Sequence, residues 1–105
     1  RADPELFSRC VDGVLATETA VYGKTLVELG EHDAWEVVPT VTCPTFVAAG
    51  GRDWVTPPAT MRRMAARMTD VDFHEFPLAS HFGIMEEGES LNLPLRAFLS
   101  RHATP

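Results

Sequence analysis

The clearest structural signal in this sequence lies in residues 43–57, which read CPTFVAAGGRDWVTP. Its residues 45–49 form a short apolar run between Pro44 and a glycine pair, which is typical of a strand buried on both faces. Asp53 follows the glycines, just beyond the carboxyl end of the predicted strand. Ligand sites of open α/β sheets lie at this edge, so Asp53 is the first candidate functional residue.

A second strand is predicted downstream, with a helix between the two. Residues 71–76 (VDFHEF) alternate apolar and polar side chains, as a strand does. The intervening helix is expected to start with Thr56 as its cap and Pro57 in its first turn. Its apolar stripe consists of Met61, Met64, Ala65 and Met68. A strand–helix–strand unit of this kind implies two adjacent, parallel strands joined by a crossover.

Helical sequence precedes this unit. The DPE sequence at residues 3–5 combines an N-cap, a proline in the first turn and an acidic residue, and apolar residues at helical spacing follow. Gly13 and Gly23 weaken the pattern, so one broken helix or two short ones are both open, and Gly30 is the expected stop. Residues 31–44 are interpreted as a connector.

The last predicted element is a helix from about Glu89 to His102, in which Pro94 is tolerated only within the first turn. The order helix, strand, helix, strand, helix defines an α/β fold class. Two parallel strands alone make a poor domain, because parallel sheets normally have several strands and two covered faces. The chain also begins with Arg1 rather than Met, and a helix start follows at once. We therefore expect a fragment of a longer protein.

Composition argues against several classes of function. The 105 residues hold 9 Lys and Arg against 15 Asp and Glu, a formal charge of −6, which disfavours nucleic acid or an anionic membrane as partner. No apolar run approaches the ~20 residues of a membrane span and no signal peptide is visible, so we expect a cytoplasmic protein. Cys10 and Cys43 are expected to be buried free thiols. No spacing typical of a zinc or phosphate site exists, and no cofactor is implied.

His81 is the second candidate, because it lies just beyond the second predicted strand. If the strands are adjacent and parallel, the side chains of Asp53 and His81 emerge at the same edge of the sheet. A carboxylate that accepts from one imidazole nitrogen leaves the other free to act as a base. Taken singly, Asp53 is more often a turn or cap residue and His81 a surface histidine. Their paired positions favour the functional interpretation.

The residues around both candidates resemble those of the α/β-hydrolase superfamily. Gly50, Asp53 and Pro57 fit the family's G-x-x-D-x-x-x-P pattern, which follows an apolar strand. The ASHF sequence at residues 79–82, with two acidic residues at 86–87 and then an amphipathic helix, is similar to the family's histidine loop and last helix.

This resemblance spans residues 43–101 and implies a role for each candidate. Asp53 would be the acid of a catalytic triad and His81 its general base. Trp54 and Phe82, as their neighbours, would either line an apolar substrate pocket or serve as packing residues.

The resemblance also suggests a division of the chain. Residues 43–105 would form the C-terminal βαβα part of an α/β-hydrolase domain. Residues 1–42 would be a helical segment and connector, either the end of a cap or the helix before the penultimate strand. The sequence departs from the family at Ser80, where glycine is common before the histidine.

The nucleophile of such a triad is missing. The serines are Ser8, Ser80, Ser90 and Ser100, and none lies in a G-x-S-x-G motif. Because the nucleophile comes first in this family, we expect it in an N-terminal remainder of the same protein. The first hypothesis is an esterase-like serine hydrolase of small, uncharged esters or similar acyl compounds, inactive as the isolated chain.

Two alternatives stay open. The same fold serves dehalogenase, peroxidase or carbon–carbon hydrolase chemistry, and fold resemblance does not choose among them. In the second alternative, the chain is a non-catalytic α/β interaction module, and its exposed sheet edge pairs with another polypeptide.

Overall fold

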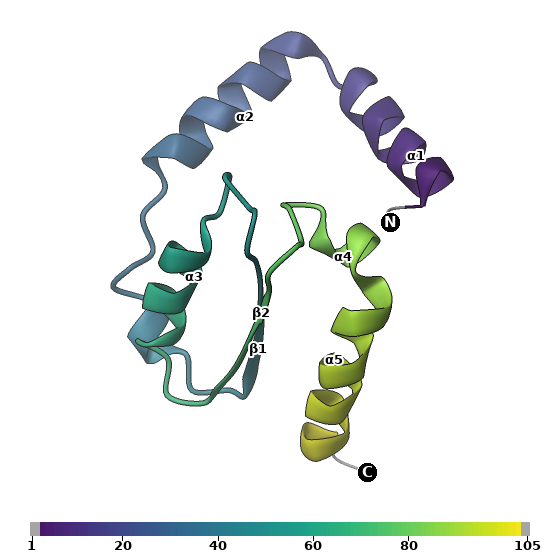
Figure 1. The fold of residues 1–105 in the computed structure, drawn as a ribbon. Helices are drawn as coiled ribbons and strands as arrows, with labels where there is room; N and C mark the ends of the chain where they lie inside the picture. The colour runs from purple at the N-terminus through teal and green to yellow at the C-terminus, as the bar shows by residue number, and fades with distance from the viewer. Residues whose placement is uncertain (1–2, 104–105) are drawn as a thin grey trace.

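The computed structural model describes residues 3–103, built around a two-stranded parallel sheet (Figure 1). Strand β1 (Thr45–Gly50) pairs with β2 (Val71–Phe76), from Thr45 opposite Val71 to Gly50 opposite Phe76. The predicted strands and their parallel pairing are thus confirmed. Because the register has no offset, both strands end together, and the loops that follow them leave the sheet side by side.

Two helices cover the sheet, one on each face (Figure 1). Helix α3 (Pro58–Ala65) connects the strands and packs on one face, and α5 (Gly88–His102) packs on the other. The apolar side chains buried between these layers and under the adjoining loops are Val47, Ala49, Ala65, Ala79, Leu91 and Phe98. This small core fixes the two strand ends and therefore the loops that carry Asp53 and His81.

The N-terminal helical sequence forms two helices, which decides between the two possibilities left open. Helix α1 (Pro4–Leu15) begins at the predicted cap, since the Asp3 carboxylate accepts hydrogen bonds from the amides of the next turn. Helix α2 (Thr19–Glu31) runs through Gly30, so the predicted stop at Gly30 is wrong. The chain leaves α2 at His32 with extended backbone angles, and no residue with positive φ is needed there.

Helices α1 and α2 form an arch that rises away from the sheet (Figure 1). Neither contains a buried residue. Cys10 in α1 and Cys43 before β1 are both exposed, so the prediction that these free thiols are buried is wrong. The exposed large apolar side chains of α1 and α2 are Leu6, Phe7, Val11, Val14, Leu15, Val21, Tyr22, Leu26, Val27 and Leu29. Apolar surface of this extent is typical of a face that packs against further protein.

Two features of the C-terminal half differ from expectation. A one-turn helix, α4 (Gly83–Glu86), occupies part of the stretch interpreted as irregular. Pro94 lies in the middle of α5, so the expectation that this helix tolerates Pro94 only within its first turn is wrong. Proline provides no N–H for the carbonyl of Ser90, one turn earlier, but Ser90 is exposed and water can replace the lost donor.

A short 3₁₀ helix, η1 (Val38–Thr40), lies in the connector before β1.

Candidate active site

Backbone hydrogen bonds join the two loops that leave the sheet. The Gly51 amide donates to the Phe76 carbonyl across 2.9 Å, which extends the strand ladder by one step. The Arg52 amide then donates to the Ala79 carbonyl, also at 2.9 Å. The loop that holds Asp53 is therefore attached to the loop that holds His81 before any side chain takes part.

The glycine pair after β1 allows this close approach. A Cβ on Gly50 would lie 2.6 Å from the Ser80 carbonyl oxygen, and one on Gly51 would lie 2.7 Å from the Cα of Pro77. Both distances are shorter than any real Cβ contact, and both obstacles are backbone atoms. Glycine is required at these positions because the histidine loop crosses directly over them.

Asp53 and His81, 28 positions apart in sequence, form a hydrogen bond of 3.0 Å between Oδ2 and Nδ1. Asp53 is buried, with 8% of its surface exposed. The His81 side chain is 43% exposed, and the described residues give hydrogen-bond contact to Nδ1 alone. An ionised carboxylate only accepts, so Nδ1 carries the proton and a neutral imidazole presents Nε2 as a free base.

Three further hydrogen bonds hold the Asp53 carboxylate. Oδ1 accepts from the amides of Val55 (2.8 Å) and Thr56 (2.9 Å), and Oδ2 accepts from the Thr56 hydroxyl at 2.6 Å. Burial alone would raise the pKa of Asp53, but the hydrogen bonds from Thr56, His81 and Val55 outweigh it and lower the pKa from 3.8 to about 2. Asp53 is therefore ionised throughout the physiological range.

Thr56 has a different role from the one predicted. Helix α3 starts at Pro58 with Pro57 at the capping position, and no side chain caps its amides. The Thr56 hydroxyl turns back to Asp53 instead. The threonine–proline sequence is compatible with both uses, and only the position of Asp53 decides between them.

The histidine loop is held by a second carboxylate. Glu86, in α4, accepts from the Ser80 amide at Oε2 (2.6 Å) and from the Ser80 hydroxyl at Oε1 (2.8 Å). The sequence placed Glu86 after the histidine but predicted neither contact. Thr56 and Glu86 are thus the two site residues whose roles sequence reasoning missed.

Solved structures with a similar fold include two hydrolases. One is a thermophilic esterase from Thermogutta terrifontis, solved with malate bound. It has a TM-score of 0.65 and 32% sequence identity, and the match covers 69% of this chain and 26% of the esterase. The other is the enol-lactonase from Burkholderia xenovorans LB400, with a TM-score of 0.63 at 24% identity, over 67% of this chain and 26% of that one. This chain belongs to the α/β-hydrolase superfamily. No protein-family model and no curated protein matches the sequence.

The likeness covers only part of an α/β-hydrolase. The matched region is about a quarter of the length of each of those two enzymes, 26% in both cases. Its helices and two parallel strands correspond to the C-terminal part of the α/β-hydrolase fold. At 24% identity the enol-lactonase supports the fold alone, whereas the esterase adds a relationship in sequence.

Two cavities of about 180 Å³ each lie beside the histidine loop of this α/β-hydrolase chain. One is lined in part by Asp53, Ser80 and His81 themselves. The other is apolar and lies between Phe82 and one face of α1; its α1 residues are Phe7, Cys10, Val11, Val14 and Leu15. The Phe82 ring packs edge-on against Phe7 and against His81, with centroid distances of 5.8 and 6.0 Å.

Of the two predicted pocket residues, the structure brings only Phe82 to a cavity. Trp54 is 84% exposed and lines neither cavity beside the histidine loop. The assignment of Trp54 as a pocket residue stays a prediction.

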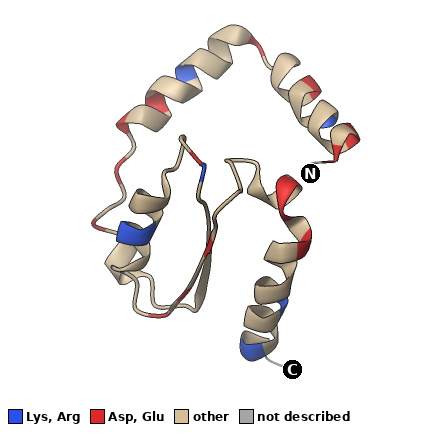
Figure 2. Ribbon diagram, in the orientation of Figure 1, with Lys and Arg blue, Asp and Glu red and all other residues tan. Residues whose placement is uncertain are grey.

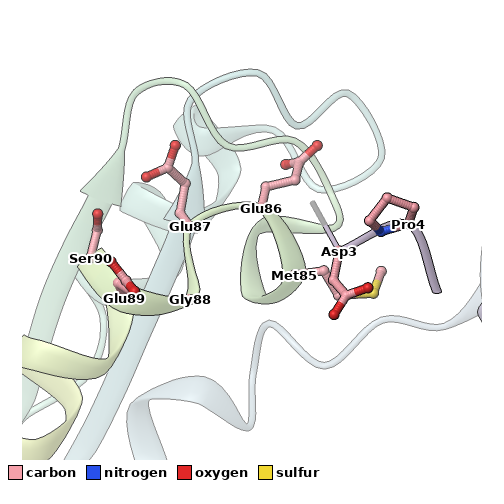
Figure 3. A pocket seen from close by; sticks show the side chains of 8 residues that line it. All are labelled: Asp3, Pro4, Met85, Glu86, Glu87, Gly88, Glu89 and Ser90. Carbon is pink, nitrogen blue, oxygen red and sulfur yellow. The ribbon is translucent and has the colours of Figure 1, made fainter. Parts of the chain in front are cut away.

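A larger hollow of about 930 Å³ lies where α1 and α4 meet the start of α5 (Figure 3). Acidic side chains line much of it, and acidic residues also gather there in the charge distribution (Figure 2). Over residues 3–103, no three His, Cys, Asp or Glu side chains come together as a metal site requires. The candidate site is placed at Asp53 and His81, because this hydrogen-bonded pair lines a cavity at the end of the sheet.

None of the helices within the described part of the chain has the length and apolar character of a membrane span.

Proposed function

We propose that this chain supplies the acid and the general base of an α/β-hydrolase active site, with Asp53 as the acid and His81 as the base. The observation that carries the proposal is the hydrogen bond of 3.0 Å between a buried, ionised carboxylate and a half-exposed imidazole. In the reaction, Nε2 of His81 takes the proton of the nucleophile and later returns it to the leaving group. Asp53 keeps the ring in position and stabilises the imidazolium that forms.

The nucleophile is proposed to be a serine outside these 105 residues, in an N-terminal remainder of the protein. Ser80 is the serine nearest to His81 in sequence, but its hydroxyl donates to Glu86 and accepts from the Phe82 amide. It is therefore occupied by bonds that hold the loop. An alkoxide formed there would also face the Glu86 carboxylate, which opposes a second negative charge.

The proposed substrate is a small, uncharged ester or a related acyl compound. The apolar cavity between Phe82 and α1 adjoins His81 and suits an uncharged group. The two similar solved enzymes are described as an esterase and an enol-lactonase, and an enol-lactone is itself an ester.

The decisive experiment measures ester hydrolysis with and without the proposed nucleophile. The 105-residue chain alone is expected to hydrolyse p-nitrophenyl esters no faster than its His81→Ala variant. In the full-length protein, His81→Ala is expected to lower kcat/KM by roughly 10²–10⁴, the usual contribution of a general base.

His74 offers a matched control. Its Nε2 lies 2.9 Å from the Asp72 carboxylate, so it is a second histidine–aspartate pair, but it lies within β2 and away from the loops. His74→Ala should leave kcat/KM unchanged. Activity of the isolated chain above the His81→Ala background would refute the missing nucleophile, and full activity of the full-length His81→Ala variant would refute the base.

A further inference from the structure

We infer that Glu86 is a positioning residue for the general base, acting through Ser80. The inference rests on the proposed role of His81. The Glu86 carboxylate binds both donors of Ser80, the residue directly before the histidine: the amide at 2.6 Å and the hydroxyl at 2.8 Å. A residue whose amide and side chain are both held has little freedom to rotate, and the Cα of His81 is one peptide unit away.

Ser80 is also held from the opposite direction. Its carbonyl oxygen lies over Gly50, so close that a Cβ there would approach to 2.6 Å. The same carbonyl accepts from the Gly83 amide at 3.1 Å. Ser80 is therefore fixed between the end of β1 on one side and the Glu86 carboxylate on the other.

Backbone bonds make the segment between Ser80 and Glu86 a closed turn. The Met85 and Glu86 amides both donate to the Phe82 carbonyl, at 2.8 and 3.1 Å. The side-chain bonds from Glu86 to Ser80 complete the ring, and His81 lies inside the closed segment. Asp53 then has only the imidazole ring itself to orient, because the backbone that carries it is already in place.

The chemistry of the contact requires two acceptors on one side chain. Ser80 presents an N–H and an O–H to Glu86, and the two carboxylate oxygens accept one each. Glutamine keeps one acceptor for the amide, and its NH₂ donates to the serine oxygen. It should therefore replace glutamate in part. Alanine has no acceptor, and aspartate, one methylene shorter, retains the charge without the reach.

Glu87 provides the matched control. It is adjacent in sequence, carries the same charge and is likewise half-buried, but the described residues give its side chain no hydrogen-bond partner. A Glu87→Ala variant therefore changes the net charge as Glu86→Ala does without releasing Ser80.

The test is proton and nitrogen NMR of the histidine side chains in the full-length protein. The readout is the low-field Nδ1–H resonance of His81, assigned by its loss in His81→Ala and in Asp53→Asn. We expect Glu86→Ala and Glu86→Asp to lose this resonance at a temperature where circular dichroism shows the fold intact. Glu86→Gln should retain it with faster exchange against water, and Glu87→Ala should match the wild type.

The outcomes separate the two proposals. A Glu86→Asp variant that keeps the resonance with wild-type exchange overturns the positioning role and leaves the Asp53–His81 pair standing. A wild-type chain without the resonance overturns the pair, and with it the proposed function. Ser80→Ala guards against a fold defect in the Glu86 variants, because it removes only the hydroxyl bond. It should shorten the lifetime of the resonance without abolishing it.

Discussion

Replacing Gly50 by alanine tests the close contact on which the site geometry depends. The added Cβ would lie 2.6 Å from the Ser80 carbonyl oxygen and 2.7 Å from that of Ala79. Ordinary van der Waals contact begins at 3.4 Å, so these backbone atoms would have to move by about 0.8 Å. Overpacking of this kind costs about 1–3 kcal/mol, and alanine recovers about 0.5–1 kcal/mol of backbone entropy. We expect a net loss of up to about 2.5 kcal/mol.

Urea unfolding followed by circular dichroism measures this loss, with Gly23→Ala as the control. Gly23 lies inside α2, and a Cβ there meets no atom within 4 Å. Gly23→Ala should therefore stabilise the chain by about 0.5–1 kcal/mol, through helix propensity alone. The two glycine substitutions are thus predicted to have opposite signs. A Gly50→Ala chain at least as stable as the wild type would refute the seating of the histidine loop on the end of β1.

Two further predictions concern the charge on Asp53. Thr56→Val removes the hydrogen bond of 2.6 Å from the Thr56 hydroxyl to Oδ2 of Asp53. The substitution should raise the pKa of Asp53 from about 2 towards 3.8 and lower the free energy of unfolding by about 1–2 kcal/mol. Carboxyl ¹³C titration and urea unfolding measure the two effects, and an unchanged pKa would contradict the assigned bond. The pKa of Asp53 is lower in the folded chain than in the unfolded one, so the ionised carboxylate stabilises the fold. This stabilisation is complete above a pH of about 4 and is lost as the pH falls through about 2. The stability difference between the wild type and Asp53→Asn should therefore shrink across that interval, and a constant difference would argue against the lowered pKa.

The sequence predicts the sheet well because both strands carry local signals. The alternation of β2 has the period of a strand, and the apolar run of β1 is too short for a typical helix; turn residues bound both. Two strands joined by one helix leave parallel pairing as the natural arrangement. The positions of Asp53 and His81 at one edge then follow from the register alone.

Helix ends are less predictable, because alternatives of similar energy compete there. Gly30 is a good stop in principle, but the chain leaves α2 at His32 without needing a positive φ. Pro94 disfavours the interior of a helix, yet α5 continues through it where the affected turn is exposed. The periodicity of α1 predicts an apolar face and gives no information on what that face contacts.

The residues that support the site were not predictable, because each contact depends on two loops meeting in space. Thr56 has the sequence context of a helix cap, and the nearby Asp53 carboxylate draws its hydroxyl away from that use. Glu86 appears in the sequence only as one of two adjacent acids. It is distinguished from Glu87 by the direction in which the single turn of α4 points its side chain, towards Ser80.

Different contacts stabilise the Asp53 carboxylate and orient the His81 ring. Asp53 accepts four hydrogen bonds, and three of them come from the two residues Val55 and Thr56 in its own loop. The carboxylate therefore keeps three of its hydrogen bonds whether or not His81 is present, and the imidazole adds a fourth that lowers its pKa further. His81 in turn is positioned by a backbone fixed at Ser80, and it donates to a carboxylate that is already ionised and immobile. The pair is thus preorganised from both sides, so that its one exposed nitrogen is left as the basic atom of the site.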